Sequence, residues 1–324
     1  MVRFLIRRTL LGVFVMWLIT MAVFALFFVT PNNVARTMAG RQASPQVIEQ
    51  IRERLGLDQP VWKQYLDFLG VTGDGGLLQG NLGFDYYYSR PVSEMITEAL
   101  PITISLAVGA AVIWMLLGVS NGVLSAVFPR SFVDRALTGF ALFFYSMPTF
   151  LLGLLLLYFL YFQLTLAGFR WFPPGGYVPL GDDPWGWFVH MILPWVTLAL
   201  VLAATYTRLT RASMLDVLGE DYIRTARSKG IGERRVVLTH GLRSALTPVV
   251  TQFGIDLGQL VGGVVVTETV FSLPGLGKTA IDAIVRQDLP VILGIVVFAS
   301  AAVVVANILV DVAYAVLDPR VRLH

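Results

Sequence analysis

Long runs of apolar residues, separated by shorter polar stretches, dominate the chain. Six runs reach about 20 residues or more, the length that an α-helix needs to cross the hydrocarbon core of a bilayer. They cover residues 10–29, 102–127, 136–162, 187–206, 246–266 and 291–317. Several contain Gly or Pro, which membrane helices tolerate better than soluble helices do. The pattern predicts an all-α, polytopic membrane protein with six transmembrane helices.

The distribution of Lys and Arg predicts how these helices are oriented. Basic residues gather before the first run, between the second and third, between the fourth and fifth, and after the sixth. Because short cytoplasmic loops carry an excess of Lys and Arg, we expect both termini in the cytoplasm. The first run is longer than a signal-peptide core and no A-x-A site follows it closely, so we interpret it as an uncleaved anchor.

This topology divides the chain into three segments. Residues 1–30 form an N-terminal cytoplasmic tip and the first helix. Residues 31–99 form a large extracytoplasmic region, and residues 100–324 form a core of five helices. Within the core, the segment at about 207–245 is a basic loop, too long for a plain turn and too short for a domain.

The composition excludes several classes of protein. Hydrophobic residues make up 56% of the chain and charged residues only 14%, against about 25% in a typical soluble domain. The absence of Cys removes Cys-based zinc sites and thiolate nucleophiles. The three His residues are scattered, so we expect no catalytic residue, metal or cofactor in this chain.

One short motif imitates a nucleotide site. Gly277, Lys278 and Thr279 match the end of a phosphate-binding loop, but Ser272 stands where its first glycine should be. We therefore expect no ATPase site of the chain's own.

The basic loop has the pattern of a helix, a break at Gly230 and a second helix. Asp221 is expected to cap the first piece, and Tyr222 and Ala226 then share one face. So short a helix is unstable alone and must pack on something. Either the loop is a basic segment that only satisfies the orientation rule, or its helix inserts into a groove on a cytoplasmic partner.

These residues also carry a family resemblance. The segment 222–230 (YIRTARSKG), followed by His240 and Pro248, resembles the cytoplasmic loop of ABC-importer permeases. More narrowly, it resembles the first of the two paired permeases in the peptide/nickel branch. Of the general pattern Glu-Ala-Ala-x-x-x-Gly, only Ala226 and Gly230 match. Similar stretches are 1–9 (MVRFLIRRT), 80–83 (GNLG), 262–277 (GGVVVTETVFSLPGLG) and 307–320 (NILVDVAYAVLDPR).

The resemblance implies the architecture and the assembly. It implies an ABC type I importer permease with a large extracytoplasmic loop after its first helix, in the inner membrane of a prokaryote. Such a subunit moves peptides, dipeptides or oligopeptides, or a related small solute. Its implied partners are a second homologous permease, two cytoplasmic ATPase subunits that bind ATP and Mg, an extracytoplasmic substrate-binding protein and membrane lipid. No nucleic acid is expected.

Two other classes of function compete with this one. A secondary transporter driven by protons or sodium is the main alternative, because acidic residues occur at membrane depth. Asp256 and Glu268 are the acids that support this alternative, and Asp311 is a third acid near membrane depth. Asp256 would either line a pathway or pair with a neighbouring helix, and Asp311 is more readily paired with a cytoplasmic Arg. A membrane-embedded hydrolase is opposed by the missing catalytic constellation.

Glycine-containing stretches supply the last candidates. Pro274, Gly275 and Gly277, flanked by Phe271 and Leu276, predict a tight turn just outside the fifth run. The resemblance suggests that this turn lies at the outer mouth of the pathway, where it is either a gate or a plain connection. Small residues spaced by four let another helix approach closely. This spacing occurs at Gly254, Gly258 and Gly262, and again at Gly118 and Gly122.

Overall fold

The computed structural model describes residues 2–26, 44–54, 58–72, 75–85 and 87–317, without the side chains of 2–5, 51, 258–259, 261–263 and 309–317. Within these ranges the chain is helical apart from turns and one small antiparallel sheet. The chain divides into two compact units, residues 1–101 with 275–324, and residues 102–274. Each unit is described by itself.

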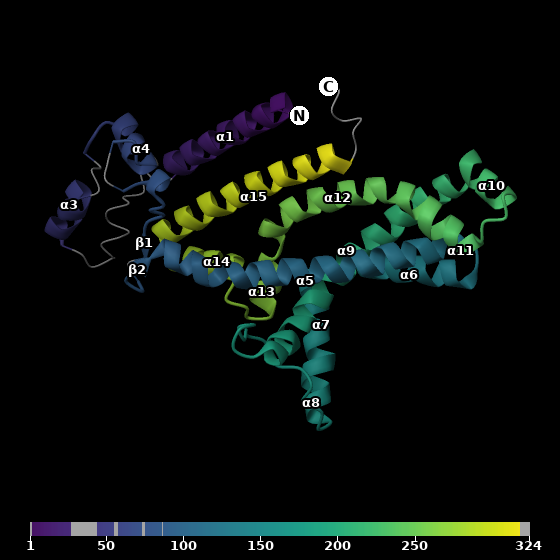
Figure 1. The fold of residues 1–324 in the computed structure, drawn as a ribbon. Coiled ribbons are helices and arrows are strands. Elements are labelled where there is room, and N and C mark those ends of the chain that lie inside the picture. Colours follow the sequence, from purple (N-terminus) through teal and green to yellow (C-terminus); the bar gives the residue numbers. More distant parts are fainter. Residues whose placement is uncertain (1, 27–43, 55–57, 73–74, 86, 318–324) are drawn as a thin grey trace. The chain divides into compact units, whose positions relative to one another are not determined.

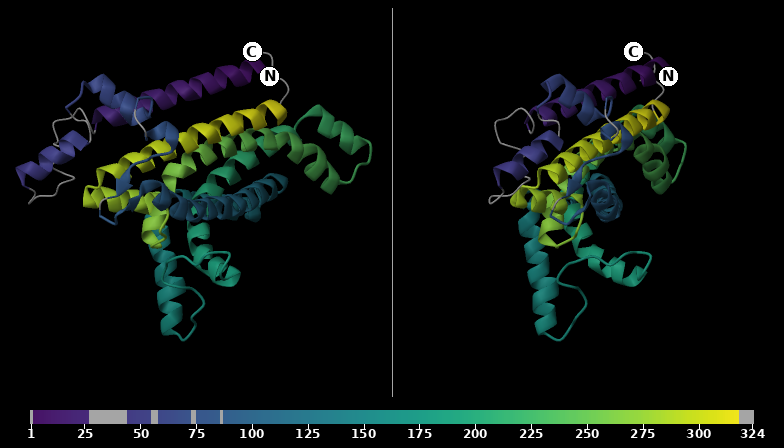
Figure 2. Two further views of the ribbon diagram at one scale, coloured as in Figure 1. Left: turned by 60° about the vertical axis from the view of Figure 1, so that its left-hand side comes forward. Right: turned by 90° about the vertical axis from the view of Figure 1, so that its left-hand side faces the viewer.

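The first unit is built on two long helices. α1 (Val2–Phe24) and α15 (Leu289–Leu317) lie side by side (Figure 1, Figure 2). Its other helices are α3 (Pro45–Arg54), α4 (Val61–Leu69), a 3-10 turn (Leu77–Gln79), the first turns of α5 (Val92–Val127) and α14 (Leu276–Arg286). β1 (Phe84–Asp85) pairs with β2 (Arg90–Pro91). Buried apolar side chains of α5, α14 and α15 form the main core of this unit.

The second unit surrounds α9 (Pro184–Leu218). The rest of α5, α6 (Phe132–Tyr145), α7 (Thr149–Leu156) and α12 (Leu242–Gly263) belong to it, and α6, α7 and α12 each contact α9. A π-helical stretch (Leu157–Gln163) and α8 (Leu164–Leu166) continue α7. α10 (Asp221–Ser228), α11 (Glu233–Arg235), a second π-helical stretch (Val236–Gly241) and α13 (Val265–Val270) complete the unit.

α5 approaches α9 closely through glycine, as the spacing of Gly118 and Gly122 predicts. A Cβ atom on Gly118 would lie 2.4 Å from the Cβ of Tyr206, and one on Gly122 would lie 2.5 Å from the Cβ of Thr210. Trp114 and Tyr206 are fully buried beside this contact. Side chains at these glycines would therefore force the two helices apart.

In the described residues, five helices are long and apolar enough to cross a membrane. They are Ile6–Phe24, Val92–Val127, Thr149–Leu166, Pro184–Leu218 and Leu289–Ile308. The predicted all-α, polytopic architecture is confirmed. The run expected at 246–266 is helical, as α12 and α13, but is not among the five. The division into residues 1–30, 31–99 and 100–324 stays a prediction.

The expected third run, residues 136–162, is not one helix. α6 ends at Tyr145, and Pro148 occupies the position before α7 with extended backbone. Proline lacks an N–H and disfavours helical backbone at the residue before it, here Met147. From this break α7 and α8 point away from α6 (Figure 1). The apolar run therefore supplies two helices, α6 and α7, which both contact α9 but point in different directions (Figure 1).

Candidate functional site

The basic loop has the expected helix, break and helix. α10 ends at Ser228, and Gly230 adopts a positive φ of 76° that returns the chain toward α11. Glycine reaches this left-handed region without the steric cost that a side chain brings. The second helical piece includes His240, which is half-buried, and continues into α12, where Pro248 lies.

α10 has one face packed against its own loop. Ile223 is fully buried and Ala226 is 8% exposed, and both pack against the buried Val236 of the returning piece. Tyr222 is 45% exposed, and its hydroxyl donates a hydrogen bond to Ser244 Oγ at 3.1 Å. The short helix is thus stabilised by this loop, and Ala226 lies inside the loop rather than on its surface.

An ion pair closes the loop on its other side. Arg227 donates to both carboxylate oxygens of Glu233, at 3.1 and 2.7 Å. The hydrogen bonds from Arg227 lower the pKa of Glu233. Both side chains are about half exposed, so water screens the pair and its main effect is to fix the geometry of the turn.

The predicted cap at Asp221 is wrong. Glu220 holds the cap position and makes no side-chain cap hydrogen bond, while Asp221 is the first helical residue. Its carboxylate pairs with Arg224 at 3.4 Å and favours the helix through the dipole at the N-terminus. Asp221, Arg224, Thr225 and Ser228 are exposed, so α10 presents a polar face to its surroundings.

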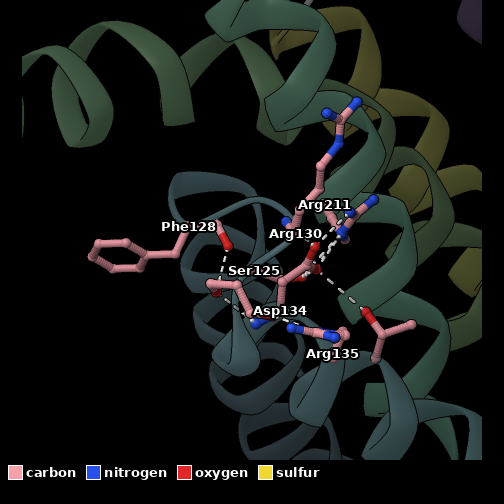
Figure 3. A network of polar contacts seen from close by, with 8 residues as sticks. Ser125, Phe128, Arg130, Asp134, Arg135 and Arg211 are labelled. Carbon is pink, nitrogen blue, oxygen red and sulfur yellow. Dashed lines mark hydrogen bonds and ion pairs between the residues drawn. The ribbon is translucent and has the colours of Figure 1, made fainter.

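A buried polar network joins three helices of the second unit (Figure 3). Asp134 of α6 is 5% exposed and accepts hydrogen bonds from Arg211 Nε and Nη2 of α9, at 2.8 and 2.9 Å. It also accepts from the Ser125 hydroxyl of α5 and from the Arg130 backbone N–H. The Arg211 hydrogen bonds hold the pKa of this carboxyl well below its usual range. The network ties α5, α6 and α9 together.

Sequence reasoning missed this network. The basic residues between the fourth and fifth runs, which include Arg211, were used only to set the orientation, and Asp134 was not considered. Two signals point to the acid. Ser131 caps α6 by accepting from the Asp134 N–H, the Ser-x-x-Asp spacing typical of a helix start. In addition, an acid beside an apolar run needs a partner.

The candidate acids have protein partners where they are described. Asp256 accepts a hydrogen bond from the Tyr206 hydroxyl of α9 at 2.7 Å and another from Gln252 at 2.9 Å. Glu268 is fully buried and accepts from the Thr103 hydroxyl of α5 at 2.6 Å. The Asp311 side chain lies outside the described residues. For Asp256 the geometry favours pairing with a neighbouring helix.

The expected outer turn differs in its backbone from the prediction. Gly275 has an ordinary extended φ of −84° and precedes α14, so it does not need the freedom of glycine. The positive φ falls on Ser272, at 52°. Phe271 is buried and its carbonyl accepts from the Gly176 N–H at 2.9 Å, while Pro274 is exposed.

The remaining predicted residues are placed as follows. Leu276 and Gly277 are buried at the start of α14 in the first unit. Gly254 is buried in α12, and the surroundings of Gly258 and Gly262 lie outside the described residues. The close approach predicted for that face therefore stays a prediction.

Comparison with known proteins places the chain in a family. Residues 118–323 match the family described as the inner membrane component of binding-protein-dependent transport systems, and residues 1–107 match its N-terminal region. The chain belongs to this family. Its membership decides between the transport classes: the permease is a subunit of an ABC importer in the inner membrane, not an ion-coupled transporter.

Individual relatives agree over their whole length. The permease is 39% identical to a probable peptide ABC transporter permease of Sinorhizobium fredii, over 98% of this chain and 99% of that protein. It is 41% identical to a putative peptide transport system permease of Brucella abortus, over 99% of both. It is 37% identical to the glutathione transport system permease GsiC of Escherichia coli K12, again over 99% of both.

A solved structure supports the fold. A chain of the inward-facing MetNI methionine ABC transporter aligns with a TM-score of 0.50 and 18% identity, covering 69% of this permease and 96% of that chain. The likeness confirms the type I importer fold. The resemblance to the peptide branch of ABC permeases is confirmed by the relatives. Membership also implies ATPase and substrate-binding-protein partners.

Proposed function

We propose that this permease is the first of two paired membrane subunits of an importer for peptides or a related small solute. Relatives aligned over nearly the whole chain are named peptide and glutathione permeases, which supports this substrate class. The importer would sit in the cytoplasmic membrane of a prokaryote, with a second homologous permease beside it. Two ATPase subunits would bind ATP and Mg, and a substrate-binding protein would deliver the solute from outside.

The polar face of α10 carries the proposed coupling to the ATPases. Ile223 and Ala226 anchor the helix in its own loop, while Arg224 and Thr225 are exposed on it. A helix fixed at one face and free at the other can enter a groove of a partner and transmit its motion without unfolding. Because the Arg227–Glu233 pair and Gly230 fix the turn, movement of α10 would be passed to α12.

Reversing the charge at Arg224 tests this coupling. In the assembled complex, Arg224→Glu should lower copurification of the ATPase subunits and substrate-stimulated ATP hydrolysis. The matched control is Arg234→Glu, because Arg234 is exposed in the same loop but outside α10. Normal association and uptake in Arg224→Glu, or an equal loss in Arg234→Glu, would remove α10 as the specific contact.

The proposed orientation has its own test, which the Cys-free sequence makes simple. An introduced thiol at Ser131 or Ser228 should resist an impermeant thiol reagent in intact cells, and one at Ser44 or Thr72 should react. The reverse pattern would place the basic loop on the extracytoplasmic side of the membrane, which contradicts its proposed contact with the ATPase subunits. Substrate class is tested separately, by uptake of labelled dipeptides, oligopeptides and glutathione with the cognate binding protein present. If none of the labelled peptides is taken up, peptides are excluded as the substrate class.

A further inference from the structure

A hollow between α6 and α9 is lined by cationic and apolar side chains. Neither family membership nor the proposed role of the basic loop gives this hollow a function. It has a volume of about 670 Å³. Its lining includes Thr138, Leu142 and Tyr145 of α6, and Thr205, Arg208 and Arg211 of α9. The lining residues include two arginines and no acid. The hollow is therefore suited to an anion.

The two arginines have different roles in this hollow. Arg211 is held by Asp134 through two hydrogen bonds, so its charge is largely neutralised and its position is fixed. Arg208 is exposed, and its described contact is with a ring: its guanidinium lies 5.6 Å from the centroid of Tyr145. A cation over an aromatic face keeps its positive charge and its N–H donors available. Arg208 is the charge that a ligand would neutralise.

The hollow has threonine hydroxyls and apolar side chains in its lining, and further apolar side chains of α6 are exposed outside it. Leu142 and Tyr145 are 49% and 55% exposed, and Phe140 and Phe143 of the same helix are 44% and 58% exposed. Tyrosine is typical of the interface between the hydrocarbon core and the headgroups. A ligand that fits this combination has an anionic group at one end and a hydrocarbon chain at the other.

We propose that the hollow between α6 and α9 binds the phosphate of an anionic phospholipid, with Arg208 as its charged contact and the exposed apolar side chains of α6 against an acyl chain. Basic pockets between membrane helices on the cytoplasmic side are typical binding places for such headgroups. The assignment to the inner leaflet rests on the proposed orientation. Lipid held here would sit beside the network that joins α5, α6 and α9.

The test measures lipid retention by the purified, delipidated complex using native mass spectrometry. Dioleoyl phosphatidylglycerol should be retained in preference to dioleoyl phosphatidylcholine at equal concentration. Arg208→Gln should lower phosphatidylglycerol retention about fivefold, the factor expected from one basic side chain near an anionic surface. Arg208→Lys should retain most of the binding. Arg135→Gln, an exposed arginine of α6 outside the hollow, should change retention less than twofold.

The outcomes separate this site from its alternatives. Equal retention of the two lipids, unchanged retention in Arg208→Gln, or an equal loss in Arg135→Gln would overturn the proposal. Displacement of the lipid by millimolar inorganic phosphate would assign the hollow to free phosphate and overturn the lipid source. Because retention is measured without transport, it is independent of ATPase copurification and peptide uptake, which test the proposed function.

Discussion

Replacing Asp134 should destabilise the permease more than any change to an exposed acid. Its carboxylate is 5% exposed and accepts hydrogen bonds from a guanidinium, a hydroxyl and a backbone N–H. Asp134→Ala would remove all of these acceptors and leave Arg211 without its partner. Removing one member of a fully buried ion pair costs about 3–5 kcal/mol. Arg211 has a 32% exposed side chain, so water compensates in part and we expect about 2–3 kcal/mol.

A conservative replacement separates the charge from the shape. Asp134→Asn keeps the volume and one acceptor oxygen, but the remaining bond with Arg211 is to a neutral amide and is weaker than a bond to a carboxylate. We expect about 1–2 kcal/mol for this variant, because the Ser125 and Arg130 contacts are partly kept. We therefore predict that the Asp134→Ala variant is less stable than Asp134→Asn, and that Asp134→Asn is less stable than the unaltered protein.

The measurement is thermal and chemical unfolding of the assembled complex in detergent. Asp216→Asn is the matched control, because Asp216 is exposed on the same helix as Arg211 and should change stability by less than about 0.5 kcal/mol. A double-mutant cycle with Arg211→Gln should show coupling of the two residues. If Asp134→Ala and the control have equal stability, the network does not hold the three helices together.

Substitutions at three further positions test other parts of the structure. Burial and then the neighbouring Asp85 carboxyl raise the pKa of Asp288 to about 6, above its ordinary 3.8. The Val291 backbone N–H and Arg286 oppose this rise without cancelling it, so the stability of the folded protein should fall as pH rises from about 4 to 6, and Asp288→Asn should flatten that change in melting temperature. Gly122→Val should lower thermal stability by about 1–3 kcal/mol or more, since its Cβ would meet α9. Ala226→Glu should abolish ATPase copurification by unfolding the loop, whereas Ala226→Ser should retain it.

Long apolar runs predicted the membrane helices because burial in a bilayer imposes such runs on the sequence. Several boundaries differ, since α5 and α9 extend beyond the predicted runs 102–127 and 187–206, and one run was read as a single helix. The run at 136–162 is continuous in hydropathy, and only Pro148 marks where α6 ends and α7 begins. Membrane helices also tolerate proline, so its presence in the sequence does not decide between a kink and a break. The structure shows a break, with Pro148 in extended backbone before α7.

The pattern of apolar and polar residues could not predict contacts between residues that are far apart in the sequence. Asp134 and Arg211 are 77 residues apart in the sequence. Asp134 is explained locally as an acid at the start of a helix, and Arg211 as one of the basic residues at the end of the basic loop. The outer turn shows a second limit. Glycine permits a positive φ but does not require it, so Gly275 is extended while Ser272 takes the left-handed conformation. The residue type limits which backbone conformations are allowed, and the packing of the fold determines which of them is adopted.

The basic loop at about 207–245 shows what the residues of a motif match do in the structure. Ala226 and Gly230, the two positions that match the general pattern, both serve the loop itself: one packs against Val236 and the other turns the chain. Arg224 and Thr225, where the sequence departs from that pattern, are exposed on α10. The matching residues thus preserve the shape of the loop, and the departing ones change the surface it offers. On the proposed coupling, Arg224 and Thr225 determine which partner the loop binds. Arg224→Glu therefore tests recognition of the partner, whereas Ala226→Glu tests folding of the loop.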